Sequence, residues 1–139
     1  RINDEMGGYV AELTIKAMLE RRLHVAASRV LVLGMTFKEN CPDTRNTRVV
    51  DVIASLQDFG AQIDVWDPWI EDVAQVDGHG AQVLSRAPAE GLYDAMVLAV
   101  PHQQFLEIGA SGIRSFGKQG SVVVDVKSVL PRGDVEVRL

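Results

Sequence analysis

Three cationic side chains lie close together in the stretch LGMTFKENCPDTRNTRVVDV. Lys38 can bind a phosphate or carboxylate as a point charge, and Arg45 or Arg48 can offer a planar pair of N–H groups to two anionic oxygens. A helix expected to open near residues 44–47 adds backbone N–H groups and the positive end of its dipole. The pattern predicts a site for a small anionic ligand. The alternative is that both arginines are solvated in a first helical turn and that Phe37 belongs to the core.

The overall charge favours a small ligand over a nucleic acid. The 139 residues carry a formal net charge of −5, whereas nucleic-acid-binding domains are usually strongly basic. A hydrophobic content of 47% is typical of one globular domain with its own core. We find neither a signal peptide nor an apolar run near the ~18 residues that span a bilayer, so we expect a cytoplasmic protein. The chain begins with Arg1 instead of Met, which suggests a fragment of a longer protein.

Cysteine and histidine usage gives no support for a nucleophile or a metal site. Cys41 is the single cysteine, which excludes an internal disulfide and a multi-cysteine zinc site. It lies in an Asn-Cys-Pro-Asp turn with no identifiable activating base, so we do not expect it to act as a nucleophile. The three histidines are spread apart, and we expect no metal ion.

Polar residues also follow three other predicted strands. Asp67 stands where dinucleotide-binding folds keep an acid for the ribose hydroxyls, although a strand-terminating turn is its more typical role. His102 could serve in acid–base chemistry, but its partner cannot be identified from the sequence, so a structural role is favoured. Lys127 and Ser128 could contact an anion, and a solvated lysine is the alternative.

Strand and helix patterns alternate along the chain after an N-terminal helix. The expected strands cover residues 29–34, 62–66, 94–100 and 121–126, with a possible short strand at 82–84 and an edge at 135–139. The expected helices cover residues 47–59, ended by Gly60, and part of 103–116.

The N-terminal segment predicts one long helix over residues 3–27. At ~1.5 Å per residue it would measure roughly 40 Å, which is more than one sheet of this size needs. Such a helix is typical of a connector or a dimer element. Its predicted apolar stripe consists of Met6, Val10, Leu13 and Ala17.

These elements predict a three-layer, Rossmann-like α/β domain with a mostly parallel sheet. We divide the chain into a connector or dimerisation helix, residues 1–27, and a Rossmann-like domain, residues 28–139. Ligands of such sheets bind at the carboxyl ends of the strands. The turn after the first strand has one glycine, Gly34, so it carries neither a dinucleotide fingerprint nor a P-loop.

The stretch Gly34-Met35-Thr36-Phe37-Lys38, followed by Asp43-Thr44-Arg45, resembles the G-x-[AT]-F-K-x-x-x-x-D-x-R segment of the UDP-glucose/GDP-mannose dehydrogenase family. In that family the segment opens the C-terminal nucleotide-sugar-binding domain. The long helix before it and the Asp-Pro after the second strand occur in the same order, so the resemblance covers essentially the whole chain. RINDEMGGYV and AVPHQQF further resemble the bacterial branch that oxidises UDP-N-acetylhexosamines for surface polysaccharides, the Vi-polysaccharide type.

The resemblance implies an NAD-dependent enzyme that oxidises the sugar C6 hydroxyl to a carboxylate through a thiohemiacetal on a cysteine. It implies that Phe37 and Lys38 contact the nucleotide-sugar, and that Arg45 reaches the NAD pyrophosphate across an interdomain cleft. Lys127 stands near a position where some members place a substrate-contacting arginine, which it can replace only as a point charge.

The same resemblance implies partners for this chain. NAD would be bound mainly by an N-terminal domain that this sequence does not contain, together with the catalytic cysteine, so the isolated chain is expected to be inactive. The long helix would join the two halves and form the core of a homodimer.

Two rival interpretations belong to other functional classes. A receiver-like signalling module needs an acidic pair at the end of the first strand, where this chain has Leu33-Gly34-Met35, so we discount it. A purely structural dimerisation domain, in which the arginines are incidental, remains open.

Overall fold

The computed structural model describes residues 2–45 and 47–139, and of residues 2–5 only the backbone; Arg1 and Asn46 lie outside the described residues. Within this part of the chain, six strands form one sheet in the order β3-β2-β1-β4-β5-β6, and every neighbouring pair is parallel. The predicted α/β class is confirmed. The strands are β1 (Arg29–Leu33), β2 (Gln62–Trp66), β3 (Gln82–Leu84), β4 (Tyr93–Leu98), β5 (Gly117–Asp125) and β6 (Val137–Arg138). The helices are α1 (Ile2–Glu20), α2 (Val49–Asp58) and α3 (Gln103–Arg114), with short 3-10 helices η1 (Val73–Gln75) and η2 (Arg132–Asp134).

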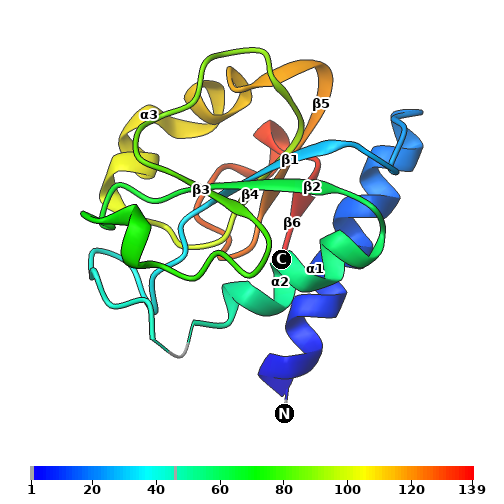
Figure 1. The fold of residues 1–139 in the computed structure, drawn as a ribbon. Coiled ribbons are helices and arrows are strands. Elements are labelled where there is room, and N and C mark those ends of the chain that lie inside the picture. Colours follow the sequence, from blue (N-terminus) through cyan, green and yellow to red (C-terminus); the bar gives the residue numbers. More distant parts are fainter. Residues whose placement is uncertain (1, 46) are drawn as a thin grey trace.

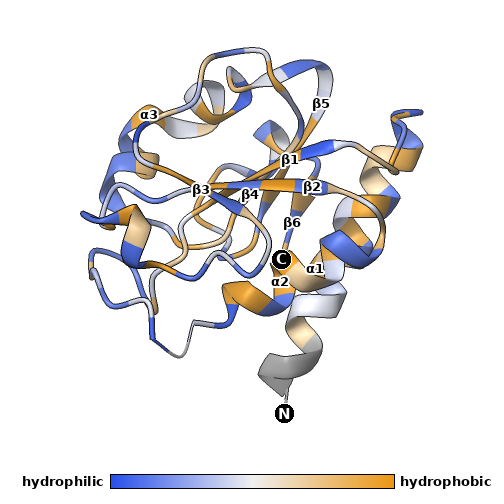
Figure 2. Cartoon of the chain, in the orientation of Figure 1, coloured by the Kyte–Doolittle hydropathy of each residue, from blue (hydrophilic) through white to orange (hydrophobic). Residues whose placement is uncertain are grey.

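The sheet lies between two layers of helices, with α1 and α2 over one face and α3 over the other (Figure 1). Successive residues of a strand point to opposite faces, so each central strand supplies both cores. In β1, Val30 and Val32 pack toward α1 and α2, whereas Leu31 and Leu33 pack toward α3. Figure 2 shows the resulting concentration of apolar residues in the central strands. Burial on both faces explains why these strands read as continuous apolar runs.

Helix α1 is shorter than predicted, since it ends at Glu20 and not at residue 27. The N–H of Leu23 donates to the carbonyl of Met18 at 2.9 Å, and that of Arg22 donates to Leu19 at 2.9 Å. This pair of bonds is a Schellman motif, with Arg22 at a φ of +60° in the position that glycine usually takes. Because no glycine stands at this helix end, the sequence pattern contains no signal for it, and the predicted helix is too long.

The buried face of α1 is also displaced from the predicted stripe. Val10 and Ala17 are buried as expected, but Met6 and Leu13 are only half-buried. The fully covered positions also include small residues that allow α1 to approach α2 closely. Among residues 6–20 of α1, the buried ones are Gly7, Val10, Ala11, Thr14, Ile15, Ala17 and Met18.

The remaining boundaries differ from the predictions by a few residues. Helix α2 starts at Val49, whose N–H donates to the Thr47 hydroxyl at 3.2 Å, so Thr47 precedes the helix it was expected to begin. Gly60 follows α2 with a φ of +95°, which confirms its predicted place after the helix. Helix α3 is interrupted at Gly109, where φ is +67°. Strand β5 begins at Gly117, earlier than the predicted residue 121.

Candidate functional site

A cavity of about 440 Å³ opens at the carboxyl ends of the strands. Its walls come from α1, the loop after β1, the start of α2 and the segments that follow β4 and β5. The lining residues are Met6, Gly7, Val10, Thr36, Phe37, Lys38, Glu39, Thr47, Arg48, Val49, Val52, Ala99, Val100, Pro101, Val126 and Lys127.

The cavity combines cationic side chains with an apolar wall. Lys38, Arg48 and Lys127 line it together with one carboxylate, Glu39. Phe37 lines it with a ring that is 56% exposed, so the alternative that Phe37 is a core residue is wrong. Positive charge beside an exposed aromatic ring suits a ligand that carries both an anionic group and a planar or apolar part.

The shape of the backbone at Gly34 brings the loop after β1 close to the end of β4. Gly34 has a φ of +94°, and a Cβ atom there would stand 2.6 Å from the Cβ of Val100. No side chain fits this contact, which explains the single glycine of the turn. Gly34 therefore allows close packing between the segments after β1 and β4, and both segments line the cavity.

Arg45 does not belong to the described residues that line the cavity. Its guanidinium donates to both carboxylate oxygens of Asp43, from Nε and from a terminal nitrogen at 3.0 Å each, and the Arg45 side chain is 85% exposed. The hydrogen bond from this side chain holds the pKa of Asp43 below its ordinary value. Of the predicted site residues, the structure therefore brings Phe37, Lys38 and Lys127 together and leaves Arg45 outside.

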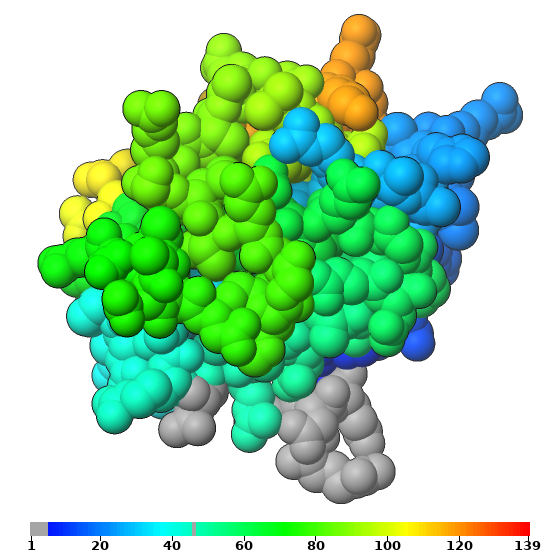
Figure 3. Space-filling view, in the orientation of Figure 1, coloured from blue at the N-terminus to red at the C-terminus, as the bar shows by residue number. Residues whose placement is uncertain are grey.

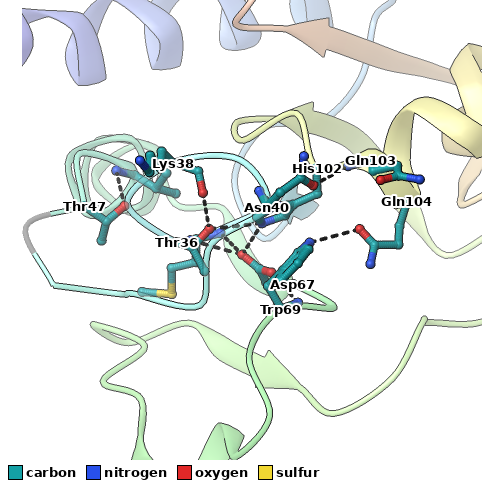
Figure 4. A network of polar contacts seen from close by, with 11 residues as sticks. Thr36, Lys38, Asn40, Thr47, Asp67, Trp69, His102, Gln103 and Gln104 are labelled. Atoms are coloured by element: carbon teal, nitrogen blue, oxygen red, sulfur yellow. Dashed lines mark hydrogen bonds and ion pairs between the residues drawn. The ribbon is translucent and has the colours of Figure 1, made fainter.

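Behind the loop lies a buried polar network centred on Asp67 (Figure 4). One carboxylate oxygen accepts from the backbone N–H groups of Met35 at 2.6 Å and Thr36 at 3.0 Å. The other accepts from the N–H of Trp69 at 2.8 Å. Burial raises the pKa of the Asp67 carboxyl, but hydrogen bonds from His102 and from these N–H groups outweigh it, so the pKa is lowered overall.

His102 is the fourth partner of Asp67, through a contact of 2.9 Å between its Nε2 and the carboxylate. Both side chains are fully buried. Asp67 thus accepts four hydrogen bonds within the protein and is buried, and its Oδ1 accepts from the N–H two residues later, which favours the strand-terminating turn over contact with a ribose hydroxyl. The buried position of His102 agrees with the structural role expected for it.

Neighbouring strands explain why these groups meet. Strand β1 pairs with β2 on one side and β4 on the other, so the residues after β2 and β4 flank the loop after β1. In the space-filling view the cyan surface of that loop lies against the green surface of the segment after β2 (Figure 3). The contacts of Asp67 with His102, and the α1 residues that line the cavity, were missed from the sequence. Knowledge of the strand order would have predicted the contact between Asp67 and His102, because the carboxyl ends of parallel strands lie at one edge of the sheet.

No group of three or more His, Cys, Asp or Glu side chains in the described part of the chain could hold a metal ion. None of the helices in the described ranges is both long enough and apolar enough to cross a membrane.

Comparison with known proteins identifies relatives along the whole chain. A UDP-N-acetyl-D-glucosamine 6-dehydrogenase of Pseudomonas aeruginosa is 45% identical over 139 residues, which are 100% of this chain and 33% of that protein. A protein of the same name from Salmonella typhi is 45% identical, with 32% of its length covered. Protein CapL of Staphylococcus aureus is 34% identical over 99% of this chain and 32% of its own. The chain therefore spans about a third of the length of these relatives.

Solved structures share the fold. A UDP-D-ManNAc dehydrogenase from Pyrococcus horikoshii matches with a TM-score of 0.74 at 21% identity, covering 95% of this chain and 29% of that one. An NDP-N-acetyl-D-galactosaminuronic acid dehydrogenase from Methanosarcina mazei matches with a TM-score of 0.78 at 23% identity, over 94% of this chain and 27% of that one.

The model of the UDP-glucose/GDP-mannose dehydrogenase family, UDP binding domain, matches residues 31–132. This range contains β1 and the loop with Phe37 and Lys38, and it extends past β5, so it includes most of the cavity wall. The chain belongs to the UDP-glucose/GDP-mannose dehydrogenase family and contains its UDP binding domain.

Proposed function

We propose that this chain is the nucleotide-sugar-binding part of an NAD-dependent UDP-sugar 6-dehydrogenase, which oxidises the sugar C6 hydroxyl to a carboxylate. The names of the two relatives at 45% identity support a UDP-N-acetylhexosamine as the sugar nucleotide. The bacterial branch that the sequence resembles makes such uronates for surface polysaccharides.

The observation that carries the proposal is the cavity at the carboxyl ends of the strands. Most of its wall lies within a family domain described as UDP binding, including Phe37, Lys38 and Lys127. In our proposal the two lysines attract the diphosphate and the exposed ring of Phe37 packs against the nucleotide-sugar. Arg48 lines the same cavity and has no assigned role in this scheme.

NAD would be the hydride acceptor and would bind mainly to an N-terminal domain outside this chain. The chain's single glycine after β1 gives it no dinucleotide fingerprint of its own, which fits this division. Arg45 is suited to a pyrophosphate bound mainly by another domain, because its side chain is exposed and does not line the cavity. A pyrophosphate would compete there with Asp43, which holds both ends of the guanidinium fork.

We assign α1 to a homodimer interface and to the connection with the N-terminal domain, and we place the enzyme in the cytoplasm. Such an interface would cover two exposed apolar side chains of α1, Tyr9 at 52% and Leu19 at 59%.

Lys38→Ala in the full-length protein tests the site. Loss of a charge-assisted contact is expected to raise the KM for the UDP-sugar by about 10- to 100-fold. Lys118→Ala is the matched control, because Lys118 pairs with Asp94 at the amino ends of the strands and should leave the KM unchanged. An unchanged KM in Lys38→Ala would contradict the assignment. Binding of UDP to the wild-type protein would exclude the purely structural alternative.

A further inference from the structure

The loop that carries Phe37 and Lys38 is partly exposed, but its backbone is hydrogen-bonded to buried side chains. Residues 37–40 are exposed, whereas Met35 and Thr36 are buried. The loop backbone nevertheless bonds to buried groups at both ends: the N–H groups of Met35 and Thr36 donate to Asp67, and that of Asn40 donates to Nδ1 of His102 at 2.9 Å. The two side chains that hold the loop come from the ends of β2 and β4.

These contacts determine where the single ring proton of His102 lies. A backbone N–H has only a hydrogen to offer, so Nδ1, which faces the N–H of Asn40, must be the unprotonated acceptor. The proton is therefore on Nε2. This one hydrogen is shared between two acceptors, the Asp67 carboxylate, 2.9 Å from Nε2, and the Thr36 hydroxyl oxygen, 3.1 Å from Nε2.

The Thr36 hydroxyl extends the network to the residue that lines the cavity. Its oxygen lies 3.0 Å from the carbonyl oxygen of Lys38, a group that can only accept, so the hydroxyl hydrogen is donated to it. Thr36 thus accepts from His102 and donates to the backbone of Lys38. Each hydrogen bond from Asp67 to Lys38 then has one possible direction.

Asn40 closes the loop on the other side. It has a φ of +56°, a conformation that asparagine tolerates better than most residues. Its side-chain oxygen accepts from the N–H of Gln103 at 2.9 Å, at the first turn of α3. Together with the bond to His102, this contact fixes Asn40 to the β4–α3 junction through both its backbone and its side chain.

We propose that Asp67, His102 and Thr36 form a positioning unit that holds the Met35–Asn40 loop in the conformation in which Phe37 and Lys38 face the ligand cavity. Asp67 and His102 do not line the cavity, and Thr36 forms part of its wall. The inference rests on the proposed function, since it explains how the chain orders the residues that bind a UDP-sugar. If the loop adopts the competent conformation only part of the time, the apparent dissociation constant rises by the inverse of that fraction.

The first test is spectroscopic and needs no ligand. ¹⁵N NMR of the full-length protein should show an unprotonated Nδ1 and a protonated Nε2 in His102. The backbone amide of Asn40 should exchange slowly although the residue is exposed. A proton on Nδ1, or fast exchange of the Asn40 amide, would overturn the inference.

The second test compares UDP affinity among variants of the full-length protein. Thr36→Val keeps the shape of the side chain but removes the bridge to Lys38, and His102→Gln keeps a donor near Asp67 but removes the acceptor for Asn40. We expect each to raise the dissociation constant of UDP about tenfold. His102→Asn places an amide oxygen near the position of Nδ1, so it should retain more affinity than His102→Gln. If one variant fails to fold, the other gives the result.

Trp69→Phe is the matched control. It removes the bond of 3.1 Å from the indole N–H to Gln104, which also joins the segments after β2 and β4, and it keeps an aromatic ring beside His102. It should lower the melting temperature and change UDP affinity less than twofold. If Lys38→Ala weakens UDP binding while Thr36→Val and His102→Gln do not, the positioning unit is wrong and the proposed function stands. If Lys38→Ala leaves UDP affinity unchanged, the proposed function itself is wrong.

Discussion

Asp67 is a carboxylate that remains ionised although its side chain is fully buried. Desolvation alone would favour its protonated form, but three backbone N–H groups and the His102 ring donate to it. Each donor stabilises the charged state, and together the donors come from the segments after β1, β2 and β4. The ionised Asp67 side chain therefore links the segments that follow β1, β2 and β4 through its hydrogen bonds.

Asp67→Asn tests this role through the pH dependence of stability. Because the folded pKa lies below the ordinary value of 3.8, the native hydrogen bonds stabilise the fold fully above that pH, and the benefit is lost as the pH falls through the folded pKa. We expect the substitution to lower the free energy of unfolding by about 2–3 kcal/mol at pH 7. The difference from wild type should shrink below about pH 4, measured by urea unfolding at several pH values.

Asp77→Asn provides the comparison for that series. Asp77 also accepts a backbone N–H, from His79 at 2.8 Å, but its side chain is 78% exposed. A surface substitution of this kind should change the stability by less than about 0.5 kcal/mol at every pH. An Asp67→Asn variant that behaved like Asp77→Asn would show that the buried network contributes little.

Arg45 carries a prediction about the cofactor. In the full-length enzyme, Arg45→Ala is expected to raise the KM for NAD about tenfold, because a charge-assisted contact to the pyrophosphate would be lost. The KM for the UDP-sugar should change little, since Arg45 lies outside the cavity. Steady-state kinetics with each substrate varied in turn separates the two effects. An effect confined to the UDP-sugar would contradict the assignment of Arg45.

At the scale of elements, the packing of α1 against α2 depends on one glycine. A Cβ atom on Gly7 would lie 2.8 Å from the carbonyl carbon of Asp51 and 3.0 Å from the nitrogen of Val52. Both are backbone atoms, so the helices would have to move apart. Gly7 also lines the cavity, which links this helix contact to the site.

Gly7→Ala and Gly8→Ala form a matched pair for this contact. Alanine favours the helix by about 1 kcal/mol at either position, but at Gly7 the overpacking should outweigh that gain and destabilise the chain by about 1–3 kcal/mol. At Gly8 a Cβ atom meets nothing within 4 Å, so the substitution should stabilise the chain. Thermal and urea unfolding measure both. Equal effects of the two substitutions would show that the close approach is unimportant.

At the scale of the whole molecule, the parallel sheet gathers every loop that lines the cavity at one edge, while α1 adds a wall from outside. The same helix buries one side in the core and exposes Tyr9 and Leu19 on the other. A helix that belongs to both the cavity wall and an exterior apolar surface would bring the nucleotide site close to a dimer interface.

Leu19→Lys tests the proposed dimer. A charge in an apolar interface is costly, so sedimentation of the full-length protein should show a shift from dimer to monomer. Leu106→Lys is the control, because Leu106 is 46% exposed on α3, which covers the opposite face of the sheet. A wild-type protein that is monomeric, or a Leu19→Lys variant that remains dimeric, would contradict an interface at this position.

Several features that depend on neighbouring residues in the sequence were predicted correctly. Alternation of apolar runs with helical patterns predicted the fold class, and β2 and β3 were predicted at their observed bounds. Gly60 was recognised as the residue after α2 because a positive φ at a helix end requires glycine in most proteins. Phe37, Lys38 and Lys127 were predicted as site residues, and they line one cavity because the carboxyl ends of parallel strands lie at one edge.

Other features depended on residues that are distant in the sequence. Helix α1 ends at Glu20 and is followed by Arg22, which has a positive φ although arginine rarely adopts one. The buried face of α1 includes Gly7, which lies close to the backbone of α2. The pairing of Asp67 with His102 required the order β2-β1-β4, which no local pattern encodes. The sequence by itself determined the fold class and the types of residue at the site. Only the tertiary structure decided their partners, because hydrogen bonds and close packing act between atoms that the fold, and not the chain order, brings together.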